Sequence, residues 1–339
     1  MRKIYSFANS NHSFLLIFLV CCVIISPILI FPGWRLDDTS WILDLLKNSP
    51  WHFSIHSYTD SMERFLPLFY SFHQMVANYT FSPHAFFTLN YTLAISSVVI
   101  LMVLLKINNV LFWCSPLLLV FIPSFSENFY RFYGDKEPFF LWSLFLLLFF
   151  TPILKTNKKP NRWIIFSIIP GTLALYFKEP GFIMLTVFAI TWLVNSNHIN
   201  PNKRINQIAP ITKSIIFILI ISSLLFLLQY IIFTEHNSEN SYLTSLTPSL
   251  NILARLKYSF KALILYSISD PLLIILLPFL IIVSHFKNIK RNFNDLEHTL
   301  TQLPVLDSLA IASFSYVLTY IALGFHGYRY LLPAYPFGI

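Results

Sequence analysis

Two adjacent aspartates, Asp37 and Asp38, follow an apolar run of 18 residues, 14–31, that contains no charged side chain. A carboxylate can accept a proton from an attacking hydroxyl group, which is the task of a general base. Beside a membrane, such a base suits the transfer of a sugar from a lipid-linked phosphate, because the reacting bond of that donor lies at headgroup level. The departing phosphate then requires cations that are already in position.

The elements that must position these groups are predicted from the composition. The chain has 339 residues, of which 56% are hydrophobic and 11% charged, and its mean hydropathy is +0.64. Soluble domains carry about 25% charged residues. Apolar blocks of about 15–25 residues match the length of a membrane-crossing helix, and a helix satisfies its own backbone hydrogen bonds in lipid. We therefore expect an all-α polytopic membrane protein that forms a single domain over 1–339.

About nine membrane-spanning helices are expected. Lysine and arginine gather in alternate connections between them, together with Arg2 and Lys3 at the N-terminus. By the positive-inside rule these connections and the N-terminus face the cytoplasm. The net charge of +8 follows this pattern and does not form a nucleic-acid-binding patch, so no nucleic-acid partner is expected. The spans are placed near 14–32, 85–105, 110–124, 138–154, 162–177, 180–194, 214–233, 262–284 and 304–323.

This orientation gathers acidic residues on the outer face, where 11 of the 15 carboxylates would lie. Charge at a membrane edge either stays in water or is grouped for a reason, because a charge at a helix centre costs about 2.5–3.5 kcal/mol. The outer acids are Asp37, Asp38, Asp44, Asp60, Glu63, Glu127, Asp135, Glu137, Glu179, Glu235 and Glu239, and the outer cations are Arg35, Arg64, Arg131, Lys136, Lys178 and Arg329.

The first outer loop, 33–84, is the longest, and its sequence predicts one amphipathic helix and a second, half-apolar segment over 64–81. The sequence DDTSWILDLLKNS begins with a helix-capping aspartate and then places Trp41, Ile42, Leu45 and Leu46 on one face. Two shorter outer turns are charged: 126–138 and 176–181. Later in the chain, Asp270 precedes a proline, a pattern that predicts a helix N-cap and an interfacial helix before it.

Four stretches in this order resemble the GT-C class of polytopic glycosyltransferases, whose members include protein mannosyltransferases and the lipid A aminoarabinose transferase. The stretches are RLDDTSW; ERFLPLFYSFHQM with SPHAFFTLNYTLA; YGDKEP with YFKEPGFIML; and GYRYLLPAYP. The resemblance implies an inverting transfer from a polyprenyl-phosphate sugar donor to a surface glycan, lipid or protein acceptor outside the cytoplasm. It also implies a multi-pass protein of the bacterial inner membrane that acts in the cell envelope, with two juxtamembrane helices in the first outer loop.

Carried over to this chain, the resemblance assigns the catalytic base to Asp37 or Asp38 and a second acidic position to Asp135 or Glu137. It implies that the donor phosphate is bound by cations. Lys178 and Arg329, with neighbouring Tyr330, carry the family's motifs, and Arg64 lies on the same side. A divalent ion, Mg²⁺ or Mn²⁺, is used by some relatives; here it would bridge Asp38 and Asp135 or Glu137. Many relatives continue beyond the position of residues 325–339, which we interpret as the abbreviated start of a further span.

Simpler roles remain open for the same residues. The aspartate pair could cap a helix, Lys178 and Glu179 could form a local ion pair, and Arg329–Tyr330 could anchor the chain at the interface. His52, His56, His73 and His84 match no metal-ligand spacing, and Cys21, Cys22 and Cys114 lie in expected spans, which disfavours disulfides and a thiolate site. Two other functions also remain open: a transporter or lipid-sugar flippase, and a truncated relative without activity.

Overall fold

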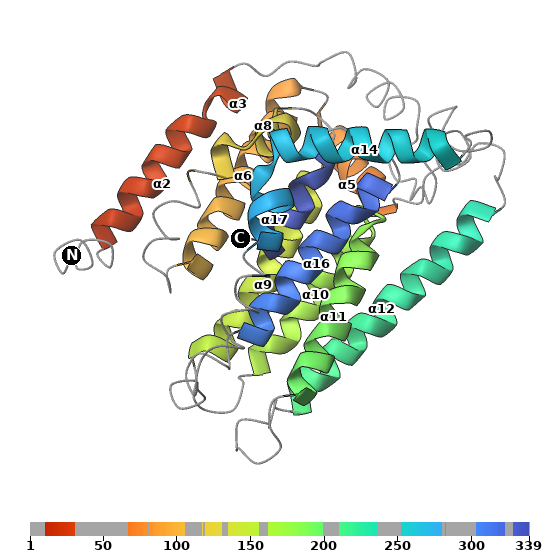
Figure 1. Ribbon diagram of the computed structural model, residues 1–339. Helices are drawn as coiled ribbons and strands as arrows, with labels where there is room; N and C mark the ends of the chain where they lie inside the picture. Colours follow the sequence, from red (N-terminus) through yellow and green to blue (C-terminus); the bar gives the residue numbers. More distant parts are fainter. Residues whose placement is uncertain are drawn as a thin grey trace.

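The protein is helical throughout the part of the chain that the structure describes. The computed structural model describes residues 11–30, 67–80, 82–105, 117, 119–130, 135–155, 162–198, 210–235, 252–279, 282, 303–322 and 328–338. These ranges contain helices and no strand, so the predicted all-α class is confirmed (Figure 1). Most of the first outer loop, including Asp37, Asp38 and Arg64, lies outside the described residues.

Five of the helices begin with a proline, which has a preset φ and lacks the N–H group that a first-turn residue leaves unpaired. These five are α3, α5, α6, α8 and α12. The elements are α2 (Asn11–Ile25), α3 (Pro27–Ile30), α5 (Pro67–Ala77), α6 (Pro83–Leu105), α8 (Pro123–Phe129), α9 (Lys136–Lys155), η1 (Arg162–Ser167), α10 (Ile168–Leu175), α11 (Gly181–His198), α12 (Pro210–Glu235), α14 (Ile252–Ser269), η3 (Leu272–Leu276), α16 (Leu303–Ala322), η5 (Tyr328–Ala334) and α17 (Tyr335–Gly338).

Among the helices that the structure describes, two are long and apolar enough to cross a membrane. They are the 22-residue segments Pro83–Leu104 of α6 and Ile211–Ile232 of α12. At 1.5 Å per residue each is about 33 Å long, close to the roughly 30 Å hydrocarbon layer. The bent pair Leu256–Ser269 and Leu272–Phe279 brings the number to three if it forms one span. Four shorter apolar helices occupy Phe14–Ile30, Trp163–Leu175, Gly181–Val194 and Ser308–Ala322, within or beside other predicted spans.

Aromatic side chains hold the centre of the bundle together. Phe337 of α17 lies between α9 and α11, with its ring centroid 5.4 Å from that of Trp142 and 5.6 Å from that of Phe188, both in edge-on geometry. Edge-to-face pairs of this kind are favoured by the aromatic quadrupole. Phe149 and Trp192 continue the contact between α9 and α11, with ring centroids 5.3 Å apart. The described part of segment 325–339 is thus packed inside the bundle.

The chain bends sharply where the sequence predicts one continuous span over 262–284. Leu256–Ser269 and Leu272–Phe279 meet at 106°, and Asp270 and Pro271 form the break. As a result, α14 runs across one end of the bundle, whereas α12 and α16 run along its length (Figure 1). A single straight span over all of 262–284 is therefore wrong, because Pro271 cannot continue the backbone hydrogen bonding of α14. The prediction from the Asp270–Pro271 pattern, a separate helix over 256–268 and a new helix from about 270, agrees with this break.

Candidate functional site

The most prominent polar feature of the described chain is a buried ion pair between Asp135 and Lys178. Lys178 Nζ lies 2.7 Å from Asp135 Oδ1, and both side chains are under 10% exposed. Asp135 immediately precedes α9, and Lys178 lies in the turn between α10 and α11. The prediction that these two short outer turns gather their charges in one place is supported by this contact.

Local structure explains how Asp135 is held. The backbone N–H of Asp135 donates a hydrogen bond to Asn128 Oδ1 near the end of α8, and the Asp135 carbonyl accepts one from the Phe139 N–H in the first turn of α9. Asn128 in turn donates through Nδ2 to the Ser124 carbonyl, 2.8 Å away. Because Asn128 is fully buried and uses both ends of its amide, it fixes the backbone that carries Asp135.

A second pair of titratable groups is formed by His73 of α5 and Glu137 in the first turn of α9. His73 Nε2 is 3.3 Å from Glu137 Oε1, and the two side chains are 2% and 3% exposed. Lys136 Nζ lies 3.6 Å from the same carboxylate oxygen. Helix α5 supplies the histidine and packs against the turn after α10, where the Leu68 N–H donates to the Tyr176 carbonyl.

The hydrogen bonds of His73 constrain where its protons sit. Its Nδ1 lies 2.9 Å from the Phe69 carbonyl oxygen, which can only accept, so Nδ1 must carry a proton. Its Nε2 then faces the carboxylate of Glu137 at 3.3 Å, so the imidazole bridges the backbone of α5 and the acid of α9.

The charges around Glu137 set its ionisation. Burial raises the pKa of the Glu137 carboxyl, but the Lys136 ammonium and the hydrogen bond and charge of His73 outweigh burial, so the pKa is held below its ordinary value. Glu137 is thus kept ionised in a site from which water is largely excluded.

Three carboxylate oxygens in this cluster are buried and lack a hydrogen bond of good geometry from the described residues: Asp135 Oδ2 and both oxygens of Glu137. Glu137 Oε1 nevertheless lies 3.3 Å from His73 Nε2 and 3.6 Å from Lys136 Nζ, close enough for both groups to act on its charge. Buried carboxylate oxygens normally accept hydrogen bonds, so these three stand out among the described side chains.

A third buried carboxylate, Asp270, lies at the break between α14 and η3. Its Oδ1 accepts hydrogen bonds from the Ser124 and Tyr335 hydroxyls, and its Oδ2 accepts one from Ser269. Asp270 stands at the predicted cap position, where its backbone carbonyl accepts from the Leu273 and Ile274 N–H groups, but its side chain bonds to these hydroxyls. Ser124 and Asn128 connect Asp270 to Asp135.

The predicted site residues are thus brought together in part. Asp135, Glu137 and Lys178 meet at one end of the bundle. Arg329 and Tyr330 fall within η5, which packs against α8, although their side chains are not described. Asp37, Asp38 and Arg64 lie outside the described residues, so their distance to this cluster stays a prediction.

Comparison with family models, with curated proteins and with solved structures finds no match for this chain.

Metal binding receives no support from the described side chains, which contain no group of three or more histidine, cysteine or acidic residues placed to hold an ion. Asp135 is already neutralised by Lys178, and Glu137 lies beside Lys136. The predicted divalent ion requires Asp38 as a further ligand, and Asp38 lies outside the described ranges.

His73 and Asn128 are the site residues that sequence reasoning missed. The sequence offers His73 only as a metal ligand, without a matching ligand spacing. The available signal is its position: a histidine and a glutamine lie together in the half-apolar stretch 64–81, on the same predicted side as Glu137. Asn128 carried no signal, because its role depends on a backbone N–H group seven residues away.

Proposed function

We propose that this protein is an integral-membrane glycosyltransferase. It transfers a sugar from a polyprenyl-phosphate donor to a surface glycan, lipid or protein acceptor on the extracytoplasmic side, with inversion at the anomeric carbon. The proposal includes a GT-C-like arrangement of about nine membrane-spanning helices with juxtamembrane helices in 33–84. The observation that carries it is the buried cluster in which Asp135 pairs with Lys178 beside Glu137 and His73.

In the proposed reaction the acceptor hydroxyl oxygen attacks the anomeric carbon, and the bond from that carbon to the phosphate oxygen breaks. The phosphate leaves with the bonding electrons and stays attached to the lipid. The hydroxyl proton passes to Asp37 or Asp38 as general base. Lys178, Arg64 and Arg329 stabilise the phosphate charge, and Tyr330 borders that site.

The cluster gives Asp135 and Glu137 distinct roles in this mechanism. Asp135 holds the Lys178 ammonium at 2.7 Å and so orients it before the donor arrives. Glu137 is kept ionised beside Lys136 and His73, and in this mechanism its buried carboxylate oxygens accept a hydrogen bond from the acceptor hydroxyl. Such preorganisation of charge in a water-poor site is the main source of rate acceleration in many enzymes.

The test is sugar transfer in membranes from cells that express the intact chain. Radiolabelled polyprenyl-phosphate sugars serve as donors, and mass analysis of surface glycans with and without the gene identifies the transferred unit. Asp37→Asn, Asp38→Asn and Asp135→Asn are compared with the matched acid-to-amide control Glu127→Gln, which alters a half-buried acid of α8. We expect loss of transfer by Asp135→Asn and by at least one loop variant. Full activity in all three site variants would exclude this mechanism.

A specific observation also favours a second candidate, a transporter or lipid-sugar flippase. The helix pair α14–η3 is broken at a buried acid, Asp270, and broken helices with buried ionisable groups are typical of transport sites. A cysteine replacing Ser124, which donates to Asp270, distinguishes the two functions. Modification of this cysteine from each side of the membrane in turn would favour transport; access from one side alone would favour the enzyme.

A further inference from the structure

Helix α14 presents an unusual surface at the end of the bundle. After the 106° bend, Leu256–Ser269 runs across the ends of the other helices instead of along them (Figure 1). One face packs inward: Ala262 and Tyr266 are fully buried, and the Ser259 hydroxyl donates to the Ala322 carbonyl of α16. Because these residues face the bundle, the residues on the opposite side of α14 face away from it.

The outer face of α14 is apolar from Leu256 to Ile268. Leu256, Phe260, Ile264 and Ile268 recur every four residues and form one continuous stripe. Phe260 is 64% exposed and Ile268 is 75% exposed. A helix with this pattern lies in the plane of a membrane interface with its apolar stripe among the acyl chains.

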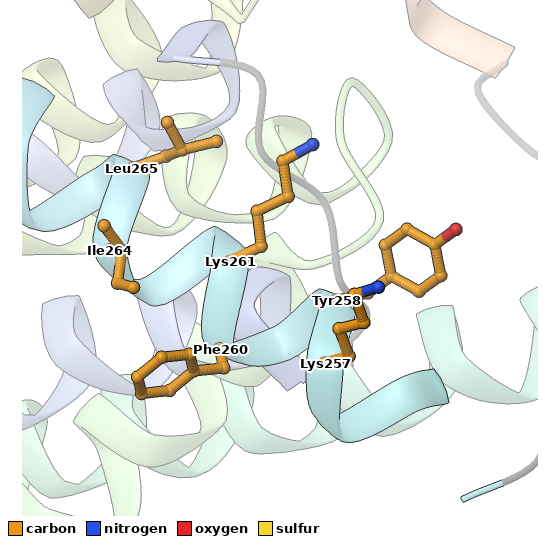
Figure 2. Close-up of a pocket in the computed structure, with 6 residues that line it drawn as sticks. All are labelled: Lys257, Tyr258, Phe260, Lys261, Ile264 and Leu265. Atoms are coloured by element: carbon orange, nitrogen blue, oxygen red, sulfur yellow. The ribbon is translucent and has the colours of Figure 1, made fainter. Parts of the chain in front are cut away.

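Two lysines border this stripe. Lys257 and Lys261 are one turn apart on the exposed surface, so their ammonium groups follow the same edge of the helix. They line a hollow of about 490 Å³ together with Tyr258, Phe260, Ile264 and Leu265 (Figure 2). Among the described residues, neither lysine forms an ion pair. The hollow combines two ammonium groups with an apolar wall.

We propose that this hollow binds the phosphate group of an anionic membrane lipid. The two ammonium groups complement the phosphate, and Phe260 and Ile264 contact the first part of the hydrocarbon chain. A soluble phosphate would satisfy the lysines but would leave the apolar stripe in water. A zwitterionic lipid would satisfy the stripe but would bring its own cation to the lysines. An anionic lipid satisfies both, and this inference does not depend on the proposed enzymatic activity.

The test uses the full chain in nanodiscs of phosphatidylcholine containing a minority of phosphatidylglycerol. The photoreactive amino acid p-benzoylphenylalanine replaces Tyr258, which lines the hollow and is 45% exposed. After illumination, mass spectrometry of the protein gives the ratio of phosphatidylglycerol to phosphatidylcholine adducts. We expect this ratio to exceed the ratio of the two lipids in the nanodisc.

Lysine substitutions then test the charge. A basic residue near an anionic surface contributes about 1 kcal/mol, which corresponds to about a fivefold change in binding. We expect Lys257→Gln and Lys261→Gln each to lower the adduct ratio by up to about fivefold, and the double variant to lower it further. The control Lys213→Gln removes an exposed lysine of α12 at the other end of the bundle and should leave the ratio unchanged (Figure 1).

Three results would overturn the proposal. An adduct ratio equal to the lipid ratio would mean that the hollow does not select anionic lipid. An equal loss in Lys213→Gln would mean that the net charge of the protein is responsible, not this helix. Suppression of the adducts by added inorganic phosphate would indicate a site for soluble phosphate instead of lipid. Because the altered lysines are exposed, each variant is expected to fold, which gel filtration checks before illumination.

Discussion

Breaking the buried Asp135–Lys178 pair should destabilise the protein far more than removing both of its charges. At 2.7 Å and an effective dielectric constant of about 20, the attraction between two unit charges is about 6 kcal/mol. Moving each ion out of water costs several kcal/mol, so the intact pair contributes little net stability. Removing one partner loses the attraction but leaves the other ion buried.

We therefore expect Lys178→Met to lower the free energy of unfolding by about 3–5 kcal/mol, and Asp135→Asn by a similar amount. The double variant Asp135→Asn/Lys178→Met should lie within about 1 kcal/mol of the unaltered protein, because two neutral groups of similar volume then share the site. The control is Lys213→Met, an exposed lysine of α12, for which the expected change is below about 0.5 kcal/mol.

Unfolding in mixed detergent micelles, titrated with a denaturing detergent, measures all four variants under one condition. The decisive quantity is the coupling free energy of the double-mutant cycle. If the effects of the two single substitutions simply add, the two charges do not interact and the buried pair is not a structural unit. If the single variants match Lys213→Met, the cluster is exposed to solvent, and the argument for a preorganised site fails with it.

Two further predictions concern the groups around this pair. Lys136 and His73 hold the pKa of Glu137 below its ordinary value of about 4.5, so the Glu137 carboxylate stabilises the fold above that pH. This contribution is lost as the pH falls through the lowered pKa. The free energy of unfolding, measured from neutral to acid pH, should therefore fall less steeply for Glu137→Gln, and an unchanged slope would contradict the assignment. Asp270→Asn should lower the free energy of unfolding by about 1–3 kcal/mol, because one amide oxygen cannot accept from three hydroxyl donors as two carboxylate oxygens do. Tyr335→Phe, which removes one of these donors, should lower it by about 1 kcal/mol. Tyr258→Phe on the exposed face of α14 is the control and should leave it unchanged.

The sequence predicts the helical class and the meeting of two charged turns, for the same physical reason. Apolar blocks of membrane-crossing length are readable without any tertiary information, and alternation of the blocks places every second connection at one end. Asp135 and Lys178 lie in two such connections, so sidedness alone brings them near each other. The sequence places Asp135 and Lys178 only at the same end of the helices, whereas in the structure the two side chains are in contact at 2.7 Å.

Asp270 shows why the remaining contacts were not predictable. Its local sequence, Ser-Asp-Pro, fits a helix cap, and a cap is satisfied by near neighbours alone. The actual donors, Ser124 and Tyr335, are 146 and 65 residues away in the sequence. Only packing brings them together, and apolar periodicity does not encode which hydroxyl on a buried face meets which carboxylate. His73 and Glu137 are found together for the same reason.

The short helix α8 connects Asp270 with the backbone of Asp135. It has seven residues, too few to be stable by itself. Ser124, near its start, donates to the Asp270 carboxylate, and Asn128, near its end, accepts from the Asp135 N–H. The helix is therefore held at both ends by side-chain hydrogen bonds, one of which joins it to the bend between α14 and η3. We expect a substitution that removes the Ser124–Asp270 bond to shift the backbone of Asp135 through α8.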